Sequence, residues 1–258
     1  MKLYLKALKL HFKPMLEYRS SLIFSFISQI AVFFSFYFVI LSIFDKFNNI
    51  KGFTLYEVLL CFSVIQFGYS VCECFARGID EFDKLIISGN FDRILLRPKN
   101  KILQVMTTEI DFIKSIRFVQ AIIVMIIALI KLNINWNIYK VITLILMNIS
   151  AIIIFFSIFL LAASYCFLTV KGLEVRNVFT DGGKNIAQSP IGIFDKYFVK
   201  IFTYIIPYAC VNYYPLMYFI GKSDNVLYGF LPIIVLLYLI PCFLIFNKGS
   251  KNYLTTGS

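Results

Sequence analysis

The charged residues best placed to do chemistry stand at the start of one apolar run. Glu109, Asp111, Lys114 and Arg117 lie within nine residues of one another, and the uncharged run that follows them has only 13 residues. Because 13 residues are too few to cross a bilayer, a spanning helix there must begin near Phe112 and include two cations. Such charges either pair beside the lipid headgroups or have a function, in which case they line a vestibule that faces the cytoplasm or hold the polar loop before them; the sequence leaves these interpretations open.

Other chemical sites are poorly supported by the sequence. His11 is the single histidine, which argues against a Ser-His-Asp set and against most transition-metal sites. The six cysteines contain no C-x-x-C pair, so we expect neither a disulfide framework nor a zinc site. Gly183-Lys184 is the nearest match to a phosphate loop, but Val178 replaces its first glycine and Asn185 its Ser or Thr. We therefore expect a chain that is not an enzyme and that holds no cofactor or metal.

The elements that position these charges are those of a membrane protein. The chain is 60% hydrophobic with a mean hydropathy of +0.81, values that a soluble domain of 258 residues does not have. Its net charge of +11 comes from basic residues between apolar runs, a pattern typical of membrane proteins rather than of nucleic-acid binding. The predicted fold is an all-α polytopic membrane protein: an amphipathic helix over 1–19, then one domain over 20–258 with six spans, at about 20–44, 54–75, 112–132, 141–168, 197–220 and 226–246.

The distribution of positive charge orients the predicted spans. With the N-terminus in the cytoplasm, 18 Lys and Arg residues fall on the cytoplasmic side and 5 fall in the outside loops. Since cytoplasmic loops carry the excess of Lys and Arg, both termini are predicted to be cytoplasmic. This count assigns the whole region 169–200 to the cytoplasmic side.

The polar loop between the second and third predicted spans, Gly78–Lys101, is predicted to form two short amphipathic helices, and we call it the elbow segment. Gly89 marks the bend between them, Asn90 is expected to cap the second helix, and Pro98 ends it. A segment of this kind lies on the bilayer surface or docks onto a soluble partner. In the first helix, the predicted apolar face carries Ile79, Phe82, Leu85 and Ile86, and the predicted polar face carries Asp80, Asp83 and Lys84.

The fifth apolar run, 197–220, is interrupted by two prolines and is not expected to be one straight helix. We expect a span that ends near Pro207, followed by a half-inserted segment that returns to the surface. This predicted re-entrant segment contains Pro207, Asn212, Tyr213, Tyr214 and Pro215.

Two motifs carry a resemblance to a known family. The run Gly89-Asn-Phe-Asp92-Arg-Ile-Leu-Leu-Arg97-Pro98 resembles the cytoplasmic motif G-x-x-D-x-x-L-x-R-P in the membrane subunits of type-two ATP-binding-cassette (ABC) exporters. The run Pro207–Pro215 resembles a P-x-A-x-x-x-Y-x-P pattern that one branch of that family carries after its fifth span. Six spans with cytoplasmic termini also fit the family, whereas the stretch 172–188 does not align with it.

The resemblance implies a permease subunit of an ATP-driven exporter in the bacterial cytoplasmic membrane. Two such subunits, identical or related, would form the pathway, and each would bind a cytoplasmic ABC ATPase that holds ATP and Mg²⁺. The first half of the elbow segment would then lie on lipid, and the pathway is expected to be aromatic and largely uncharged. The alternatives are an ion-coupled transporter that uses the third-span charges and a membrane-embedded lipid-modifying enzyme. The residues that the resemblance assigns to ATPase coupling are Gly89, Asp92, Leu95, Leu96, Arg97 and Pro98.

Overall fold

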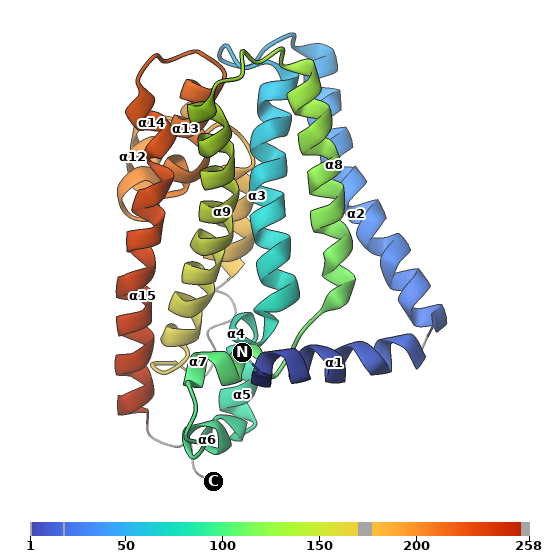
Figure 1. Ribbon diagram of the computed structural model, residues 1–258, viewed down its shortest axis with the longest axis vertical. Helices are drawn as coiled ribbons and strands as arrows, with labels where there is room; N and C mark the ends of the chain where they lie inside the picture. The colour runs from blue at the N-terminus through green and yellow to red at the C-terminus, as the bar shows by residue number, and fades with distance from the viewer. Residues whose placement is uncertain (1, 18, 170–176, 254–258) are drawn as a thin grey trace.

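The computed structural model describes residues 2–17, 19–169 and 177–253, and this part of the chain forms a bundle of helices without a β-strand (Figure 1). Within it, five helices are long and apolar enough to cross a membrane, which confirms an all-α polytopic membrane fold. They are α2 (Arg19–Lys46), α3 (Leu55–Phe75), α8 (Ser115–Lys131, preceded by the short turn η1, Phe112–Lys114), α9 (Ile138–Tyr165) and α15 (Pro232–Asn252, preceded by α14, Val226–Phe230).

Helix α3 occupies the centre of the bundle, and α2 lies at its edge. In the most apolar window of α3, 83% of the residues are buried inside the protein, against 6% for α2. Helix α3 packs along α8 and α9, and α9 packs along α15. The contact between α3 and α9 requires Gly68, because a Cβ at that position would overlap the backbone of Ala151. The apolar surface of α2 is therefore left for lipid or for another subunit.

Helix α1 (Lys2–Glu17) runs across one end of the bundle, and α2 diverges from the bundle toward the same end (Figure 1). The Tyr4 hydroxyl donates to the Phe75 carbonyl at 2.6 Å, and Nε2 of His11 lies 3.2 Å from the Thr107 carbonyl oxygen. The predicted amphipathic N-terminal helix therefore has an exposed side and is also held to the bundle by these polar contacts.

The elbow segment lies at this end and contains α4 (Arg77–Asp80), α5 (Phe82–Ile87) and α6 (Asn90–Leu95), with α7 (Lys101–Met106) after it. As predicted, the chain bends at Gly89, whose φ of +66° favours glycine. The predicted cap is wrong, because Gly89 stands directly before the first helical turn. Asn90 is already in that turn, and its side-chain amide donates to the Ser88 hydroxyl at 2.9 Å.

The first half of the elbow segment is buried, so the assignment of this half to the lipid surface is wrong. Phe82 is fully buried, and its ring lies 4.9 Å from that of Phe91, 5.2 Å from that of Phe167 and 5.6 Å from that of Phe246. We call these four rings, together with that of Tyr253, the aromatic cluster. On the predicted apolar face, Ile79, Phe82 and Ile86 are buried as expected, and Leu85 is half-buried. On the predicted polar face, only Lys84 is exposed, whereas Asp80 and Asp83 are buried.

Residues 197–220 form several short pieces, in agreement with the interruption that the prolines predict. Helix α12 (Lys196–Tyr204) ends before Pro207, and the π-helical turn η4 (Ala209–Tyr213) and α13 (Tyr214–Phe219) follow. Ahead of these pieces come η2 (Val178–Gly182), α11 (Gly183–Ala187) and η3 (Ile191–Ile193).

The segment around η3 lies at the end of the bundle opposite the elbow segment. Lys51, in the loop between α2 and α3, donates to the Ile193 carbonyl at 2.7 Å, and Lys222 donates to the Gly52 carbonyl at 2.7 Å. Helix α12 lies beside α13 and α14 at this same end (Figure 1). The charge count had grouped Lys196 and Lys200 with the elbow side, and the structure separates them from it.

Candidate functional site

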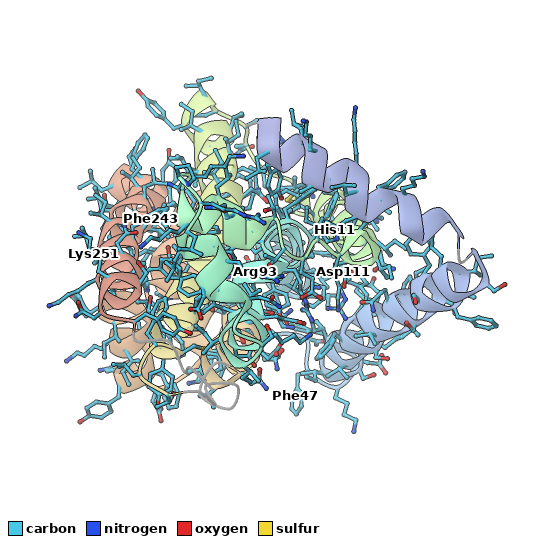
Figure 2. All side chains as sticks on the ribbon, turned by 90° about the horizontal axis from the view of Figure 1, so that it is seen from below. His11, Phe47, Arg93, Asp111, Phe243 and Lys251 are labelled. Carbon is cyan, nitrogen blue, oxygen red and sulfur yellow. The ribbon has the colours of Figure 1, made fainter. Side chains whose placement is uncertain are left out.

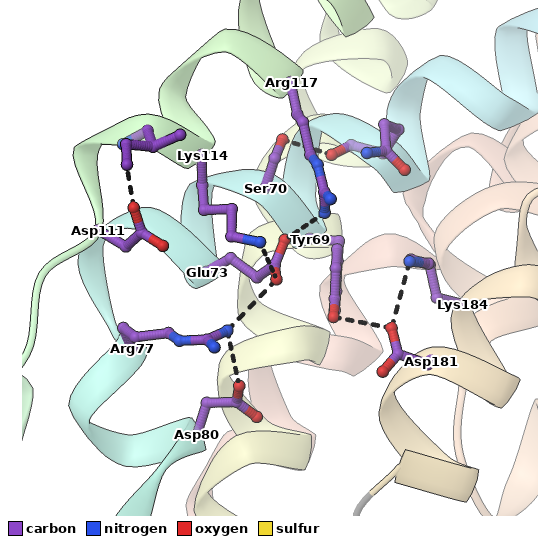
Figure 3. A network of polar contacts seen from close by, with 12 residues as sticks. Tyr69, Ser70, Glu73, Arg77, Asp80, Asp111, Lys114, Arg117, Asp181 and Lys184 are labelled. Carbon is purple, nitrogen blue, oxygen red and sulfur yellow. Dashed lines mark hydrogen bonds and ion pairs between the residues drawn. The ribbon is translucent and has the colours of Figure 1, made fainter. Parts of the chain in front are cut away.

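Glu73, near the end of α3, is the centre of a buried ion-pair network (Figure 3). Its carboxylate lies 3.4 Å from Nη1 of Arg77, 3.5 Å from Nζ of Lys114 and 3.0 Å from Nη1 of Arg117. Its side chain is 5% exposed, a degree of burial that a carboxylate tolerates only with cationic partners. One carboxylate thus joins α3, α4 and the start of α8.

Arg77 extends the network from Glu73 into the elbow segment. Its guanidinium lies 3.4 Å from the Asp80 carboxylate and forms an ion pair with Glu81, which in turn pairs with Lys84. Burial alone would lower the pKa of Arg77, but the charges of Glu81, Asp80 and Glu73 outweigh burial and raise it. Arg77 is therefore a permanent cation between the end of α3 and α5.

A second polar cluster connects α3 to the η2–α11 segment. The Tyr69 hydroxyl donates to Asp181 at 3.0 Å, and Lys184 lies 3.3 Å from the same carboxylate oxygen. Nζ of Lys184 also lies 4.2 Å from the centre of the Tyr69 ring, a cation–π geometry. Figure 3 shows these three side chains beside the Glu73 network.

Buried amides continue this connection away from the elbow segment. The Gln188 side chain donates to that of Gln66 at 2.9 Å. Asn212, fully buried in η4, donates to the carbonyls of Ala187 at 3.0 Å and Cys61 at 3.3 Å. These bonds hold the broken segment against α3, which gives Asn212 of the predicted re-entrant segment a structural role.

The other residues predicted for the re-entrant segment lie around Asn212. Pro207 falls between α12 and η4, and Pro215 lies in the first turn of α13, where its missing N–H leaves no helical bond unmade. Tyr213 and Tyr214 are half-buried, and their rings lie 5.2 Å apart. All of them are at the end opposite the elbow segment.

Both polar clusters line one cavity of about 490 Å³, which we call the charged cavity. It extends from Arg77 to Phe62, roughly 20 Å along α3 at about 1.5 Å per residue. Apolar side chains of α2, Val32, Phe33 and Phe36, line part of its wall, and uncharged polar side chains line another part. The charged members of the lining are Glu73, Arg77, Asp80, Lys114, Arg117, Asp181 and Lys184.

The four charged residues singled out in the sequence divide into two pairs. Lys114 and Arg117 line the charged cavity. Asp111 instead accepts a hydrogen bond from the backbone N–H of Ile113 at 3.0 Å and caps the turn η1. Glu109 faces the elbow segment, where its side chain forms a hydrogen bond with Glu81.

The Glu81–Glu109 contact brings two carboxyl groups together. Burial and then the charge of Glu81 raise the pKa of Glu109. Burial opposes ionisation of Glu81 too, but its bond to Lys84 and the charge of Arg77 prevail and lower its pKa. When the two carboxyl groups hold one proton between them, the proton therefore lies on Glu109, which donates a hydrogen bond to Glu81.

The residues predicted to couple to an ATPase lie at the tip of the elbow segment. Leu96 is 86% exposed, and Arg97 and Pro98 are exposed beside it, whereas Gly89, Asp92 and Leu95 are half-buried. Viewed from this end, Arg93 of α6 lies near the middle of the molecule, between Lys251 on one side and His11 and Asp111 on the other (Figure 2). The tip is therefore accessible to a partner.

Sequence reasoning missed several residues of the charged cavity. Glu73 carried a usable signal, because an ionisable side chain within an apolar run is functional by default. Asp181 and Lys184 carried none, since they fall in the stretch 172–188 that the family resemblance did not cover. Nothing in the local pattern pointed to their contact with Tyr69.

Comparison with known proteins identifies a family. A sequence model described as "ABC-2 family transporter protein" matches residues 26–257, a range that contains the charged cavity and the elbow segment. Neither curated proteins nor solved structures gave a match.

Proposed function

Because the chain belongs to the ABC-2 transporter family, we propose that it is the permease subunit of an ATP-driven exporter. A separate cytoplasmic ATPase binds ATP and Mg²⁺ and docks on the tip of the elbow segment. Two permease subunits, identical or related, form the pathway across the bacterial cytoplasmic membrane. The chain itself performs no hydrolysis.

The observation that carries the proposal is the packing behind the exposed tip. Phe91 of α6 lies 5.5 Å from Phe167, just after α9, and 5.4 Å from Tyr253, just after α15. The side-chain amide of Gln104 donates to the carbonyl of Lys99 at 3.1 Å and holds the turn after α6. Since dense aromatic packing transmits displacement, a push on the tip would move the ends of two spanning helices.

The course of the chain supports six crossings. Phe167 packs against Phe82 at the elbow end, whereas Ile193 accepts a hydrogen bond from Lys51 at the opposite end. We infer that the chain between Phe167 and Ile193 makes a further crossing in addition to the five spanning helices, because its two ends lie at opposite ends of the bundle. We assign 191–220 to a re-entrant segment on the outer side.

The positive charges support a cytoplasmic elbow segment and cytoplasmic termini. With Lys196 and Lys200 moved to the outer side, the number of Lys and Arg residues changes from 18 to 16 on the cytoplasmic side and from 5 to 7 on the outer side. The excess keeps its direction, so the orientation does not depend on how the fifth crossing is drawn.

The experiment that tests the proposal is purification of the tagged full chain from its native membrane, with the co-purifying proteins identified by mass spectrometry. We expect an ABC ATPase and ATP hydrolysis in the eluate, and none from the chain purified alone. Leu96→Asp combined with Arg97→Glu should reduce the amount of bound ATPase at least about tenfold, because a buried charge in an interface core is costly. Leu227→Asp is the control, since Leu227 is 71% exposed at the opposite end.

Two outcomes would contradict the proposal. One is transport by this chain alone, driven by a proton gradient, which would favour an ion-coupled transporter that uses the charged cavity. The other is unchanged ATPase association in the tip variant, once membrane insertion of that variant has been verified.

A further inference from the structure

We propose that the charged cavity binds an amphiphile by its anionic head group, and that this amphiphile is the transported substrate; this rests on the proposed function. Lys114 and Arg117 bind the head group at the elbow end of the cavity. The apolar part of the molecule lies along the aromatic side chains of α2 and α3.

Charge is divided unequally at the elbow end of the cavity. The Glu73 carboxylate is shared by three cations, and one of them, Arg77, also pairs with Asp80 and Glu81. Lys114 and Arg117 thus share a carboxylate that Arg77 already engages. This end of the cavity has cationic capacity left for an anion.

Arg117 has an incomplete set of hydrogen bonds. Its side chain is only 13% exposed, and among the described residues its buried Nε–H has no hydrogen-bond partner. A buried donor without an acceptor is costly. Once the guanidinium turns its Nε–H toward the cavity, a phosphate or carboxylate group would supply the oxygens that a guanidinium binds in its planar fork geometry.

The buried carboxylates at the elbow end of the cavity, Glu73 and Asp80, do not offer the same opportunity to a cation. Asp181 accepts hydrogen bonds from Tyr69 and Lys184, and Asp80 is paired with Arg77. Glu73 has three cationic partners of its own. At the elbow end of the cavity, a cationic ligand would therefore have to displace an existing ion pair, whereas an anion completes an incomplete one.

An apolar wall continues from the charged end of the cavity. Phe33 and Phe62 pack with ring centres 5.5 Å apart, and Val32 and Phe36 extend the same surface. These side chains come from α2 and α3 and lie beside the ionic end within one cavity. A small inorganic anion would leave this wall uncovered, so the geometry favours a ligand with an apolar part.

The test uses the full chain in nanodiscs of neutral phosphatidylcholine, with radiolabelled dodecyl phosphate as the probe. Dodecanol and inorganic phosphate are the competitors, because one lacks the anionic head and the other lacks the chain. We expect dodecyl phosphate to compete at least about tenfold better than dodecanol, the worth of a charge-assisted hydrogen bond. Inorganic phosphate at the same concentrations should not displace the probe.

Variants separate binding from structure. Lys114→Gln with Arg117→Gln should abolish the preference for dodecyl phosphate over dodecanol, and Arg117→Lys should retain part of it. Glu73→Gln should tighten probe binding severalfold, because it removes the internal carboxylate that competes with the head group. Lys131→Gln, at the far end of α8, is the control and should bind as the wild type does.

Equal competition by dodecyl phosphate and dodecanol would overturn the inference, and displacement by inorganic phosphate alone would overturn its apolar part. A Glu73→Gln variant that binds more weakly would also overturn it, since a network that only maintains the fold would behave in this way. ATPase association is measured on the wild type and on the same variants. A wild type that binds no ATPase would contradict the proposed function, whereas a wild type that binds the ATPase but shows no preference for the anionic head group would contradict this inference alone.

Discussion

The elbow segment and the charged cavity meet at Arg77 but are held together by different forces. On one side, the aromatic cluster is closely packed around Phe82, which is fully buried. On the other side, Glu73 holds Lys114 and Arg117 across an open space. Close packing allows few arrangements, whereas ion pairs can exchange partners when a ligand enters. The comparison suggests a rigid element where force is received and an adjustable one where substrate binds.

The largest effect should come from Phe82→Ala in the aromatic cluster. Phe82 is fully buried against three other rings, and removing such a side chain costs about 3–5 kcal/mol. We expect a marked drop of the unfolding temperature in detergent and loss of ATPase association. Phe47→Ala, at a ring that is 60% exposed, is the control and should leave both unchanged. Retained ATPase association would show that the tip does not depend on the packing behind it.

Glu73→Gln should have the next largest effect, on the other side of the comparison. It leaves three cations without their shared carboxylate, and we expect a loss of about 2 kcal/mol, less than for a dry buried pair because the cavity admits water. Dodecyl phosphate should restore most of the lost unfolding temperature, since a ligand that binds only the folded state stabilises it.

Glu57→Gln is the matched control for this prediction. Glu57 is also a buried carboxylate on α3, and it pairs with Lys222 at 2.6 Å, but at the opposite end of the helix. Its variant should be destabilised and should gain no more from dodecyl phosphate than the wild type. Equal rescue of the two variants would indicate a general effect of the amphiphile on the membrane protein.

The two regions also differ in how well the sequence predicts them. The apolar face of α5 and the bend at Gly89 were predictable, because helical periodicity and a glycine report local burial and local conformation. The charged cavity was not, because Tyr69 and Asp181 are 112 residues apart and nothing local records their contact. Periodicity also failed for Asp80 and Asp83, which are buried although they lie on the predicted polar face; Asp80 pairs with Arg77 of the same short helix.

The proposed fifth crossing shows the same limit of sequence-based prediction. Hydropathy assigned a span to 197–220, where the apolar residues are, but that stretch packs at one end of the bundle. The segment that contains η2 and α11 is more polar than 197–220. It can be buried because Gln66 and Tyr69 of α3 form hydrogen bonds with its amide and charged side chains. Buried polar contacts of this kind hide a crossing from hydropathy.

Gly89→Ala should have a smaller effect that concerns the elbow segment alone. A Cβ at Gly89 would meet no other atom, so the cost is that of the left-handed backbone, about 1 kcal/mol. The unfolding temperature should fall slightly, and ATPase association should weaken because the tip is re-aimed. Gly221→Ala is matched in backbone conformation and in free space but lies in the turn after α13, so it should leave the association intact. An equal loss for both would remove any special role of the bend.

The smallest effect should come from Glu109→Gln, where the elbow segment carries an ion-pair network of its own. The pKa of Glu109 is raised by burial and by Glu81, so its contribution to stability is full below the pKa of the unfolded chain and is lost as the pH rises through the folded-state value. Above that value two carboxylates repel, whereas a glutamine still donates to Glu81.

We therefore expect Glu109→Gln to unfold at a higher temperature than the wild type at neutral pH and at the same temperature in acid. The gain in the free energy of unfolding should be less than about 1 kcal/mol, because Glu109 is half-exposed. Unfolding temperatures measured between about pH 4 and pH 8 test this, with the exposed Asp224→Asn as the control. The low pKa of Glu81 acts in the opposite sense, because its pairing is lost only in stronger acid. A difference between variant and wild type that does not change with pH would mean that the two carboxyl groups share no proton. The adjustable interactions of the molecule would then be confined to the charged cavity.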